Sequence, residues 1–153
     1  MSVPESSAAH RIVVGIDGSP PSVDALRWAI RQAELTGAGL DAVSAWQFPV
    51  TAGAYGWAPE SGFDDIDFEA LTAKALSKVI EDVSPPASVT VRQLVVEGNP
   101  AQVLLDSATG ADLLVVGNRG HGAFADALLG SVSERCVRHA HCPVLVIHGQ
   151  VSR

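Results

Sequence analysis

The amino-acid sequence predicts an α/β protein built on an open, doubly wound, five-stranded parallel sheet with helices on both faces. Short apolar runs rich in β-branched residues alternate along the chain with longer segments whose apolar residues recur at helical spacing. The short runs are almost wholly apolar, as in strands that are buried on both faces. Right-handed crossovers between parallel strands then place the intervening helices on the two surfaces of the sheet.

The first strand and helix are predicted near the beginning of the chain. Arg11–Asp17 is a β-branched run that reads Arg-Ile-Val-Val-Gly-Ile-Asp. Ser19 and Pro20 form a helix start, because serine has a side chain free to cap and proline needs no donor at the first helical position. The helix is predicted to continue to Gly37 on apolar residues at helical spacing, which are Val23, Leu26, Ile30 and Ala33.

A second strand and a second helix follow, separated by a long loop. Gly39–Trp46 is predicted as the strand, and Gln47–Gly62 is rich in Gly, Pro and aromatic residues and shows no periodicity. A helix from about Phe63 to Val83 has an apolar stripe and is stopped by a Ser-Pro-Pro sequence. Four aromatic residues here could form a lid over a ligand, a patch for a partner or an anchor for the loop: Trp46, Phe48, Tyr55 and Trp57.

The remaining elements continue the alternation. Val89–Val96 is predicted as the third strand, and Asn99 with Pro100 begins a helix that stops at Gly110. A fourth strand over Leu113–Val116, a helix from Ser131 to about Ala140 and a fifth strand over Pro143–Ile147 complete the series. We expect one domain over residues 11–149, between a flexible tail of residues 1–10 and a short tail of residues 150–153.

Composition and charge exclude several classes of partner. The 153 residues carry a net charge of −7 and contain no tract rich in lysine and arginine, which disfavours nucleic acid and anionic membrane surfaces. No apolar stretch approaches the roughly 18 residues of a membrane span, and the first residues lack the pattern of a secretory signal. Only two cysteines occur, which fits a reducing compartment. We therefore expect a cytoplasmic protein.

A glycine-rich loop is the most informative motif of the chain. Gly117, Gly120, Gly130 and Ser131 form a G-x₂-G-x₉-G-S pattern directly after the fourth predicted strand. Glycines let a backbone approach a ligand, and amides at a helix start favour phosphate. If the first and fourth strands are neighbours, Asp17 faces the same crevice, at the carboxyl ends of the strands. The alternative is that the glycines only make turns and that Ser131 only caps its helix.

Other nucleotide-binding motifs are absent. A Walker-type loop needs Gly-Lys-Ser/Thr, but no lysine occurs after Lys78. The first strand–helix turn, Gly15-Ile-Asp-Gly18-Ser-Pro, does not fit the G-x-G-x-x-G pattern of dinucleotide-binding folds.

Two groups of residues invite a metal interpretation that their spacing disfavours. Cys136, His139, His141 and Cys142 lie close together, but no second pair of ligands occurs elsewhere. We expect Cys136 to pack as a small apolar residue and the histidines to lie at a helix end. The acidic residues at the start of the predicted second helix are explained more simply by its dipole; they are Asp64, Asp65 and Asp67.

Taken together, these residues resemble the universal stress protein family in its ATP-binding, single-domain form. Three stretches carry the resemblance: Val13-Val-Gly-Ile-Asp17-Gly-Ser19, the G-x₂-G-x₉-G-S loop, and Gly130-Ser-Val-Ser-Glu-Arg135 running on to Cys142-Pro-Val-Leu-Val-Ile147. The resemblance spans about Arg11 to His148. It implies a nucleotide-binding α-hydrolase-like fold with strand order 3-2-1-4-5.

The resemblance also implies a function, a site and an assembly. The expected function is an ATP-binding stress-response or regulatory protein whose nucleotide occupancy modulates its interactions with partners. Main-chain groups of Ala45 would recognise adenine, and Asp17 would lie by the ribose and phosphates, often with a divalent cation, here Mg²⁺. The glycine-loop residues would hold the ribose and phosphates; they are Gly117, Gly120, Gly130, Ser131 and Val132. For Asp17, a role in the strand-end turn is the alternative.

The family resemblance further implies a homodimer through the fifth strand, formed by Val144, Leu145, Val146 and Ile147. A short apolar edge strand is a pairing hazard unless it is covered, so a covered edge without dimerisation is the competing interpretation.

Catalysis has little support in the sequence. Phosphoryl transfer needs cationic groups on the phosphate and a group that positions the nucleophile. Arg119 and His121 are the evident candidates in the loop, and each could equally be a solvated side chain. We expect binding, with hydrolysis slow or absent. The alternatives are a slow ATPase or phosphotransfer enzyme and a nucleotide-free dimeric interaction module.

Overall fold

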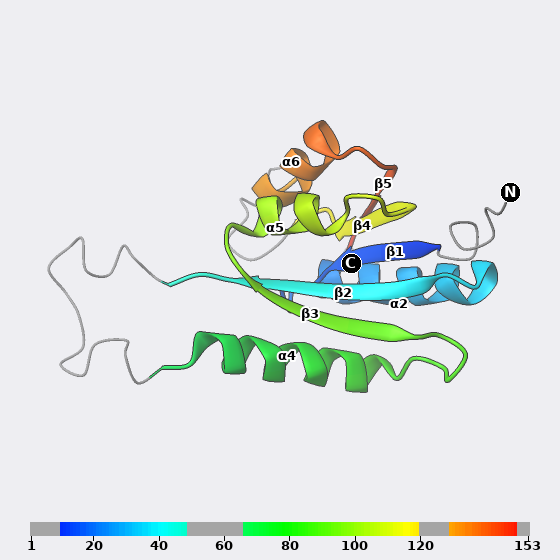
Figure 1. Ribbon diagram of the computed structural model, residues 1–153, viewed down its shortest axis with the longest axis horizontal. Helices are drawn as coiled ribbons and strands as arrows, with labels where there is room; N and C mark the ends of the chain where they lie inside the picture. The colour runs from blue at the N-terminus through cyan, green and yellow to red at the C-terminus, as the bar shows by residue number, and fades with distance from the viewer. Residues whose placement is uncertain (1–9, 49–65, 120–128, 150–153) are drawn as a thin grey trace, which may run out of the picture.

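The computed structural model describes residues 10–48, 66–119 and 129–149 (Figure 1). These residues form one sheet of five parallel strands in the order β3-β2-β1-β4-β5, which confirms the predicted fold class and strand order. The elements in chain order are β1 (Arg11–Gly15), α2 (Pro20–Thr36), β2 (Gly39–Trp46), α4 (Phe68–Val83), β3 (Val91–Glu97), α5 (Pro100–Ser107), β4 (Leu113–Gly117), α6 (Ser131–His139) and β5 (Val144–Ile147).

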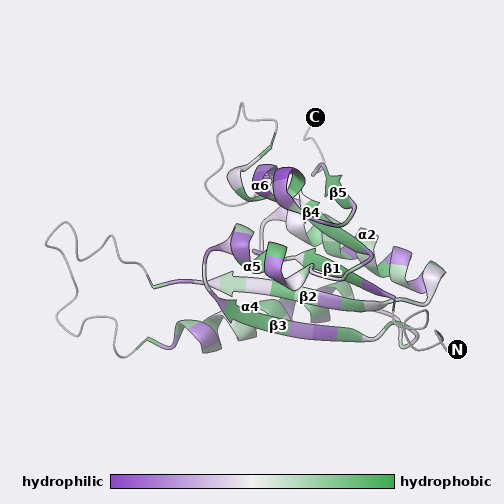
Figure 2. Ribbon diagram, turned by 45° about the horizontal axis from the view of Figure 1, so that its top comes forward, coloured by the Kyte–Doolittle hydropathy of each residue, from purple (hydrophilic) through white to green (hydrophobic). Residues whose placement is uncertain are grey.

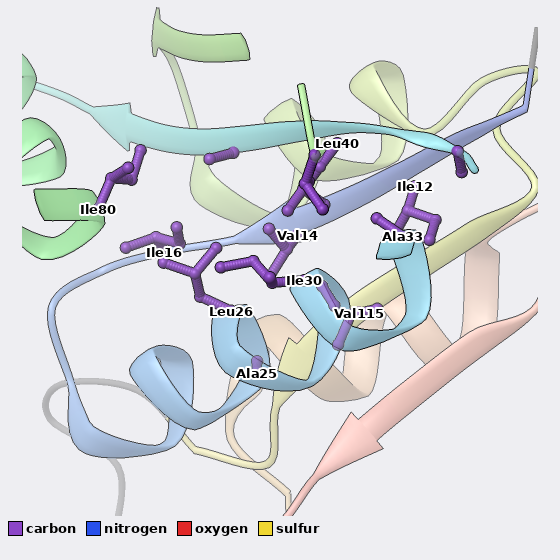
Figure 3. Close-up of a cluster of buried hydrophobic side chains, with 14 of the residues drawn as sticks. Ile12, Val14, Ile16, Ala25, Leu26, Ile30, Ala33, Leu40, Ile80 and Val115 are labelled. Carbon is purple, nitrogen blue, oxygen red and sulfur yellow. The ribbon is translucent and has the colours of Figure 1, made fainter. Parts of the chain in front are cut away.

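Helices cover both faces of the sheet, as predicted. Figure 1 shows α5 and α6 together on one side of the sheet and α4 on the other. Side chains alternate across β1. Ile12 and Val14 therefore join the apolar core beneath α2 and α4, which we name the first core. Val13 joins the apolar core beneath α5 and α6, which we name the second core. In Figure 3, Leu26 and Ile30 of α2 point toward the β1 side of the first core. None of the helices in the described ranges is long and apolar enough to cross a membrane.

Several boundaries differ from the predicted ones, and hydrogen bonding explains the clearest difference. Helix α4 begins at Phe68 instead of about Phe63, because the side chain of Asp67 accepts a hydrogen bond from Ala70 N at 2.9 Å and so caps the helix. Residues 63–65, including Asp64 and Asp65, lie outside the described residues. So do most of the predicted loop and all of the two predicted tails except His10.

An ion-pair network around the buried carboxylate of Asp41 joins the strands at the amino edge of the sheet. Asp41 of β2 has a side chain only 6% exposed and accepts hydrogen bonds from Arg11 Nη1 at 3.1 Å and from Arg92 Nε and Nη2 at 3.1 and 2.9 Å. Arg11 also donates to the carbonyls of Ser107, the last residue of α5, and of Thr109 in the turn that follows. The network therefore ties β1, β2, β3 and the end of α5 together, far from the carboxyl ends of the strands.

Candidate functional site

A pocket of about 270 Å³ opens at the carboxyl ends of β1 and β2. Ile16, Asp17 and Gly18 line it from the turn after β1, and Ser44 and Ala45 line it from the end of β2. The face of α4 closes the third side with Leu71, Thr72, Ala75 and Val79. The pocket therefore brings together two of the predicted site residues, Asp17 and Ala45, from adjacent strands.

The pocket exists because β1 ends before β2 does. The pairing of β1 with β2 runs only to Gly15 and Val43, and Ile16 N then donates to Val43 O at 2.8 Å. On the other side of β2, Gly98 N donates to Trp46 O at 2.8 Å. Main-chain groups of a strand alternate between its two neighbours, so the N–H and C=O of Ala45 face the space that β1 leaves. One donor and one acceptor of the backbone are thus presented to the pocket.

The second core explains why the side chain of Ala45 plays no part in this arrangement. The side chain of Ala45 packs against the apolar cluster beneath α5 and α6. The hydroxyl of Ser44 is also used internally, since it donates to Ile16 O at 2.7 Å. The polar groups that β2 can offer a ligand at this point are therefore those of the Ala45 backbone.

Asp17 lies in a tight turn between β1 and α2. Its Oδ1 atom accepts hydrogen bonds from Ser19 N at 2.9 Å and from Ser19 Oγ at 2.5 Å, and Gly18 has a positive φ of 84° that favours glycine. Ser19 was predicted to cap α2 with its side chain, and this is wrong: the hydroxyl donates to Asp17 and makes no cap hydrogen bond. The turn holds the exposed Asp17 carboxylate at the rim of the pocket.

Aromatic side chains lie next to the pocket, one helical turn before its α4 wall. Trp46 and Phe48 contact Phe68, with ring centroids 6.5 and 5.4 Å from it. The indole N–H of Trp46 is buried and has no hydrogen-bond partner among the residues that the structure describes. Trp46 and Phe48 thus pack onto α4. Tyr55 and Trp57, the other two aromatic residues singled out in the sequence, lie outside the described residues.

Gly117, at the end of β4, is required by packing. A Cβ atom built on Gly117 would lie 2.8 Å from the carbonyl carbon and the Cβ of Pro21. This distance is shorter than real Cβ contacts, so glycine lets the first turn of α2 sit directly against the end of β4. Its neighbour Gly120, and His121, lie outside the described residues, whereas Arg119 is partly exposed beside them.

Asn118 fixes the two ends of the glycine loop. Its main-chain carbonyl accepts hydrogen bonds from Gly130 N at 2.7 Å and from Ser133 Oγ at 2.8 Å. Its main-chain N–H donates to Ile147 O at 2.8 Å. The start of α6 and the end of β5 are therefore held against the end of β4. Because β4 lies beside β1 in the sheet, the start of α6 is on the same edge as Asp17.

The first turn of α6 differs from those of the other described helices. In α4 and α5, the side chains of Asp67 and Asn99 accept hydrogen bonds from first-turn amides, and α2 begins with two prolines. Helix α6 has Gly130 at its N-cap, which supplies no side chain. Its first amides have no acceptor within the helix and lie at its positive end, where anions are favoured.

The predicted residues of this turn have distinct environments. Ser131 is exposed and is the first helical residue, so the alternative in which it caps the helix is wrong. The side chain of Val132 packs against the second core, which leaves only its amide for a ligand. Gly130, Ser131 and Val132 are thus brought together at one helix start, separate from the pocket lined by Asp17 and Ala45.

Cys136 and Cys142 are both free thiols. Cys136 is fully buried in the second core, and burial raises the pKa of its thiol to about 11. Burial also raises the pKa of the Cys142 thiol. Since the thiolate is the form that binds metal, both are poor ligands in this setting. Within the described ranges, no three His, Cys, Asp or Glu side chains are placed to hold a metal ion.

Comparison with known proteins identifies relatives over nearly the whole chain. Residues 8–148 match the model of the Universal stress protein family. Universal stress protein Rv2623 of Mycobacterium tuberculosis (strain ATCC 25618 / H37Rv) is 40% identical over 153 residues, which cover 92% of this chain and 48% of that protein. The chain spans about half the length of the curated relatives that it matches.

Solved structures of similar fold include three universal stress proteins. UspA from Lactobacillus plantarum has a TM-score of 0.72 with 24% identity, covering 90% of this chain and 97% of that one. A universal stress protein in complex with cAMP has a TM-score of 0.63 with 27% identity, covering 93% and 98%. The universal stress protein from Archaeoglobus fulgidus in complex with dAMP has a TM-score of 0.59 with 22% identity, covering 92% and 98%.

Proposed function

Because this chain belongs to the universal stress protein family, we propose that it is an ATP-binding regulatory protein whose nucleotide occupancy modulates its interactions with protein partners. One observation carries the proposal: the main-chain donor and acceptor of Ala45 and the carboxylate of Asp17 share one pocket at the point where β1 ends. The complexes of similar proteins with cAMP and dAMP support an adenine nucleotide as the ligand class.

The base and the phosphates would occupy different parts of this edge. Adenine would lie in the pocket against α4, where Leu71, Ala75 and Val79 offer apolar surface and Ala45 offers one donor and one acceptor. The phosphates would extend past Asp17 toward Gly117, Gly120 and the start of α6. There Ser131 and Val132 would supply amides, and Gly130, whose own N–H donates to Asn118 O, would leave room for the phosphate because it has no side chain.

A divalent cation fits this arrangement. Mg²⁺ prefers oxygen ligands and is often held by one or two carboxylates together with substrate phosphates. The exposed carboxylate of Asp17 lies at the rim of the pocket and would be the protein's ligand. The cation would neutralise charge between the carboxylate and the phosphate chain, whose repulsion would otherwise oppose binding.

A homodimer through β5 is part of the proposal. The strand is an edge of the described sheet, short and wholly apolar. Its side chains are used by both cores, Leu145 and Ile147 by the first and Val144 and Val146 by the second. The backbone of the strand is therefore the part available to a second copy, which would pair with it antiparallel around a two-fold axis.

The direct test is to find the nucleotide and to measure its binding. Denaturing the purified protein and analysing the supernatant by mass spectrometry would identify any nucleotide that it carries. The stripped protein is then titrated with ATP by calorimetry, with Mg²⁺ and with EDTA. We expect saturable binding that is tighter with Mg²⁺. No released nucleotide and no heat of binding at millimolar ATP would contradict the proposal.

Two variants assign the binding to this edge of the sheet. Gly130→Val places a β-branched side chain at the N-cap of α6, and we expect at least about a tenfold loss of ATP affinity, because the phosphate amides are obstructed. Gly39→Val is the matched control at the opposite edge, where a Cβ meets nothing closer than 4.0 Å. Asp17→Asn should remove most of the gain from Mg²⁺ while leaving the fold intact by circular dichroism.

Hydrolysis of ATP by the purified protein would change the proposed function from binding protein to enzyme. ATP turnover within minutes that is lost in Arg119→Ala or His121→Ala would favour a phosphotransfer enzyme over a binding protein. A dimer that binds no nucleotide would favour an interaction module. The proposal also includes a cytoplasmic location, supported by the two free thiols, and cell fractionation tests it.

A further inference from the structure

A second, open groove lies between α5 and α6, away from the pocket at β1 and β2. Its volume is about 730 Å³, and Leu105 and Ala140 are half-buried in its lining. The exposed face of α5 and the turn after it contribute Gln102, Asp106 and Thr109. Helix α6 and the turn after it contribute Arg135, Arg138, His139 and His141. Figure 2 shows α6 mainly in the purple of hydrophilic residues. We name this surface the α5–α6 groove.

Cationic and hydrogen-bond-donating side chains dominate the α5–α6 groove. Two guanidinium groups and two imidazoles line it, against one carboxylate. That carboxylate, Asp106, already accepts a hydrogen bond from Gln102 Nε2 at 2.8 Å. Glu134, which does not line the groove, is paired with Arg138 at 3.2 Å on an exposed face. Donors are therefore gathered here on a chain whose net charge is −7.

Arg135 of α6 contacts the start of α5, the other helix that forms the groove. Its Nη1 atom donates to Asn99 Oδ1 at 3.2 Å, and the same Asn99 oxygen caps α5 by accepting from the amides of Ala101 and Gln102. One guanidinium is thus held across the two helices by a single nitrogen. Arginine presents five donors in a planar fork, so the remaining ones can serve an acceptor of paired oxygens, such as a carboxylate.

We propose that the α5–α6 groove is a docking surface for an acidic segment of a protein partner. Arg135 and His139 are one helical turn apart, so their donors recur at about 6 Å along the groove. Acidic residues at i and i+4 of a helix, or at alternate positions of an extended chain, present carboxylates at about the same spacing. Leu105 and Ala140 would contact the apolar parts of such a segment.

The shape of the groove favours a peptide over a nucleotide or a nucleic acid. The start of α5 is already capped by Asn99, so it offers no free turn of amides to a phosphate. The described residues that line the groove include no Phe, Tyr or Trp ring on which a base could stack. Two arginines are also fewer phosphate contacts than nucleic-acid-binding surfaces use. The inference does not depend on the nucleotide pocket, since no residue lines both.

The test uses the full chain and a defined probe. A fluorescein-labelled peptide of alternating glutamate and alanine is titrated by fluorescence anisotropy, beside a peptide of alternating lysine and alanine and a single-stranded oligonucleotide. We expect binding of the glutamate peptide alone, weakening several-fold between about 50 and about 200 mM salt. Binding of the oligonucleotide as tightly as the acidic peptide would overturn the proposal in favour of a nucleic-acid surface.

A matched pair of variants places the binding in the groove. Arg135→Glu/Arg138→Glu should weaken the peptide at least about tenfold, because two attractive charges become repulsive. Arg27→Glu/Arg31→Glu changes the net charge by the same amount on α2, which packs on the other face of the sheet, and should leave the affinity within about twofold. Equal losses in both variants would overturn the proposal.

ATP titrations of the same two variants separate this proposal from the nucleotide-binding one. Loss of peptide binding with unchanged ATP affinity supports the groove as an independent surface. Absence of any peptide binding in the unaltered protein at low salt overturns the groove proposal whether or not ATP binds.

Discussion

At the scale of single residues, Asp41 is the buried charge on which the amino edge of the sheet depends. Burial would raise the pKa of Asp41, but the hydrogen bonds and charges of Arg92 and Arg11 outweigh burial and hold it below its ordinary value of 3.8. We expect Asp41→Asn to lower the free energy of unfolding by about 2 kcal/mol at neutral pH, because the charge-assisted bonds are lost. Urea unfolding measures this difference.

The stability that Asp41 contributes to the fold should decrease as the pH falls into the acidic range. A carboxyl whose pKa is lower in the folded than in the unfolded state stabilises the fold above its unfolded pKa, and this contribution fades as the pH falls through the folded value. The difference between the unaltered protein and Asp41→Asn should therefore be constant from about pH 7 to about pH 5 and narrow below 3.8. Asp82→Asn is the control, since its exposed pair with Lys78 contributes less than about 0.5 kcal/mol.

Gly117 provides a second residue-scale prediction, which separates packing from ligand binding. In Gly117→Ala the new Cβ would lie 2.8 Å from the backbone of Pro21, so α2 must shift, and we expect a loss of about 1–3 kcal/mol in urea unfolding. Gly39→Ala should be neutral or slightly stabilising, because its Cβ meets nothing closer than 4.0 Å. A Gly117→Ala protein of full stability with impaired ATP binding would mean that the glycine serves the ligand and not the helix.

At the scale of elements, the sequence predicted each strand and helix because each has a strong local signal. β1 and β4 are continuous apolar runs, and prolines at the starts of α2 and α5 fix where those helices begin. The start of α4 was predicted too early, because three acidic residues precede the helix and only the structure shows that Asp67 is the one that caps it. Local patterns thus predict that an element exists more reliably than where it ends.

The candidate site was predictable to the extent that it depends on strand order. Once β1 and β4 are neighbours, Asp17 and the start of α6 must lie on one edge of the sheet. The α4 wall of the pocket was not predictable, because Leu71, Thr72, Ala75 and Val79 belong to an ordinary amphipathic helix and reach the pocket only through its packing. The donor-rich α5–α6 groove was not predictable either, because its residues come from two helices and the turns after them, which no single motif connects.

At the scale of the whole molecule, the two edges of the sheet differ in what they can do. The amino edge is closed by Asp41 with its two arginines, which ties three strands and α5. The carboxyl edge is left open where β1 stops and where α6 begins without a side-chain cap. Asn118 joins this open edge to β5 through its bond to Ile147 O. A ligand that orders the start of α6 would therefore act on the strand through which we propose that two copies pair.

That pairing gives the last prediction, which uses the direction of the backbone groups of β5. Leu114 N and Asn118 N donate to Pro143 O and Ile147 O, so alternate residues of the strand face β4, and Val146 presents its N–H and C=O outward. Val146→Pro removes this outward donor without removing a bond to β4, as proline is tolerated on an edge strand. We expect the unaltered protein to be a dimer of 15.9 kDa chains by sedimentation and Val146→Pro to be a folded monomer.

Val146→Ala is the control, because it keeps the outward donor while losing side-chain volume, and it should remain a dimer. If Val146→Ala is as monomeric as Val146→Pro, the interface is made by side chains. If Val146→Pro is still a dimer, the interface lies elsewhere.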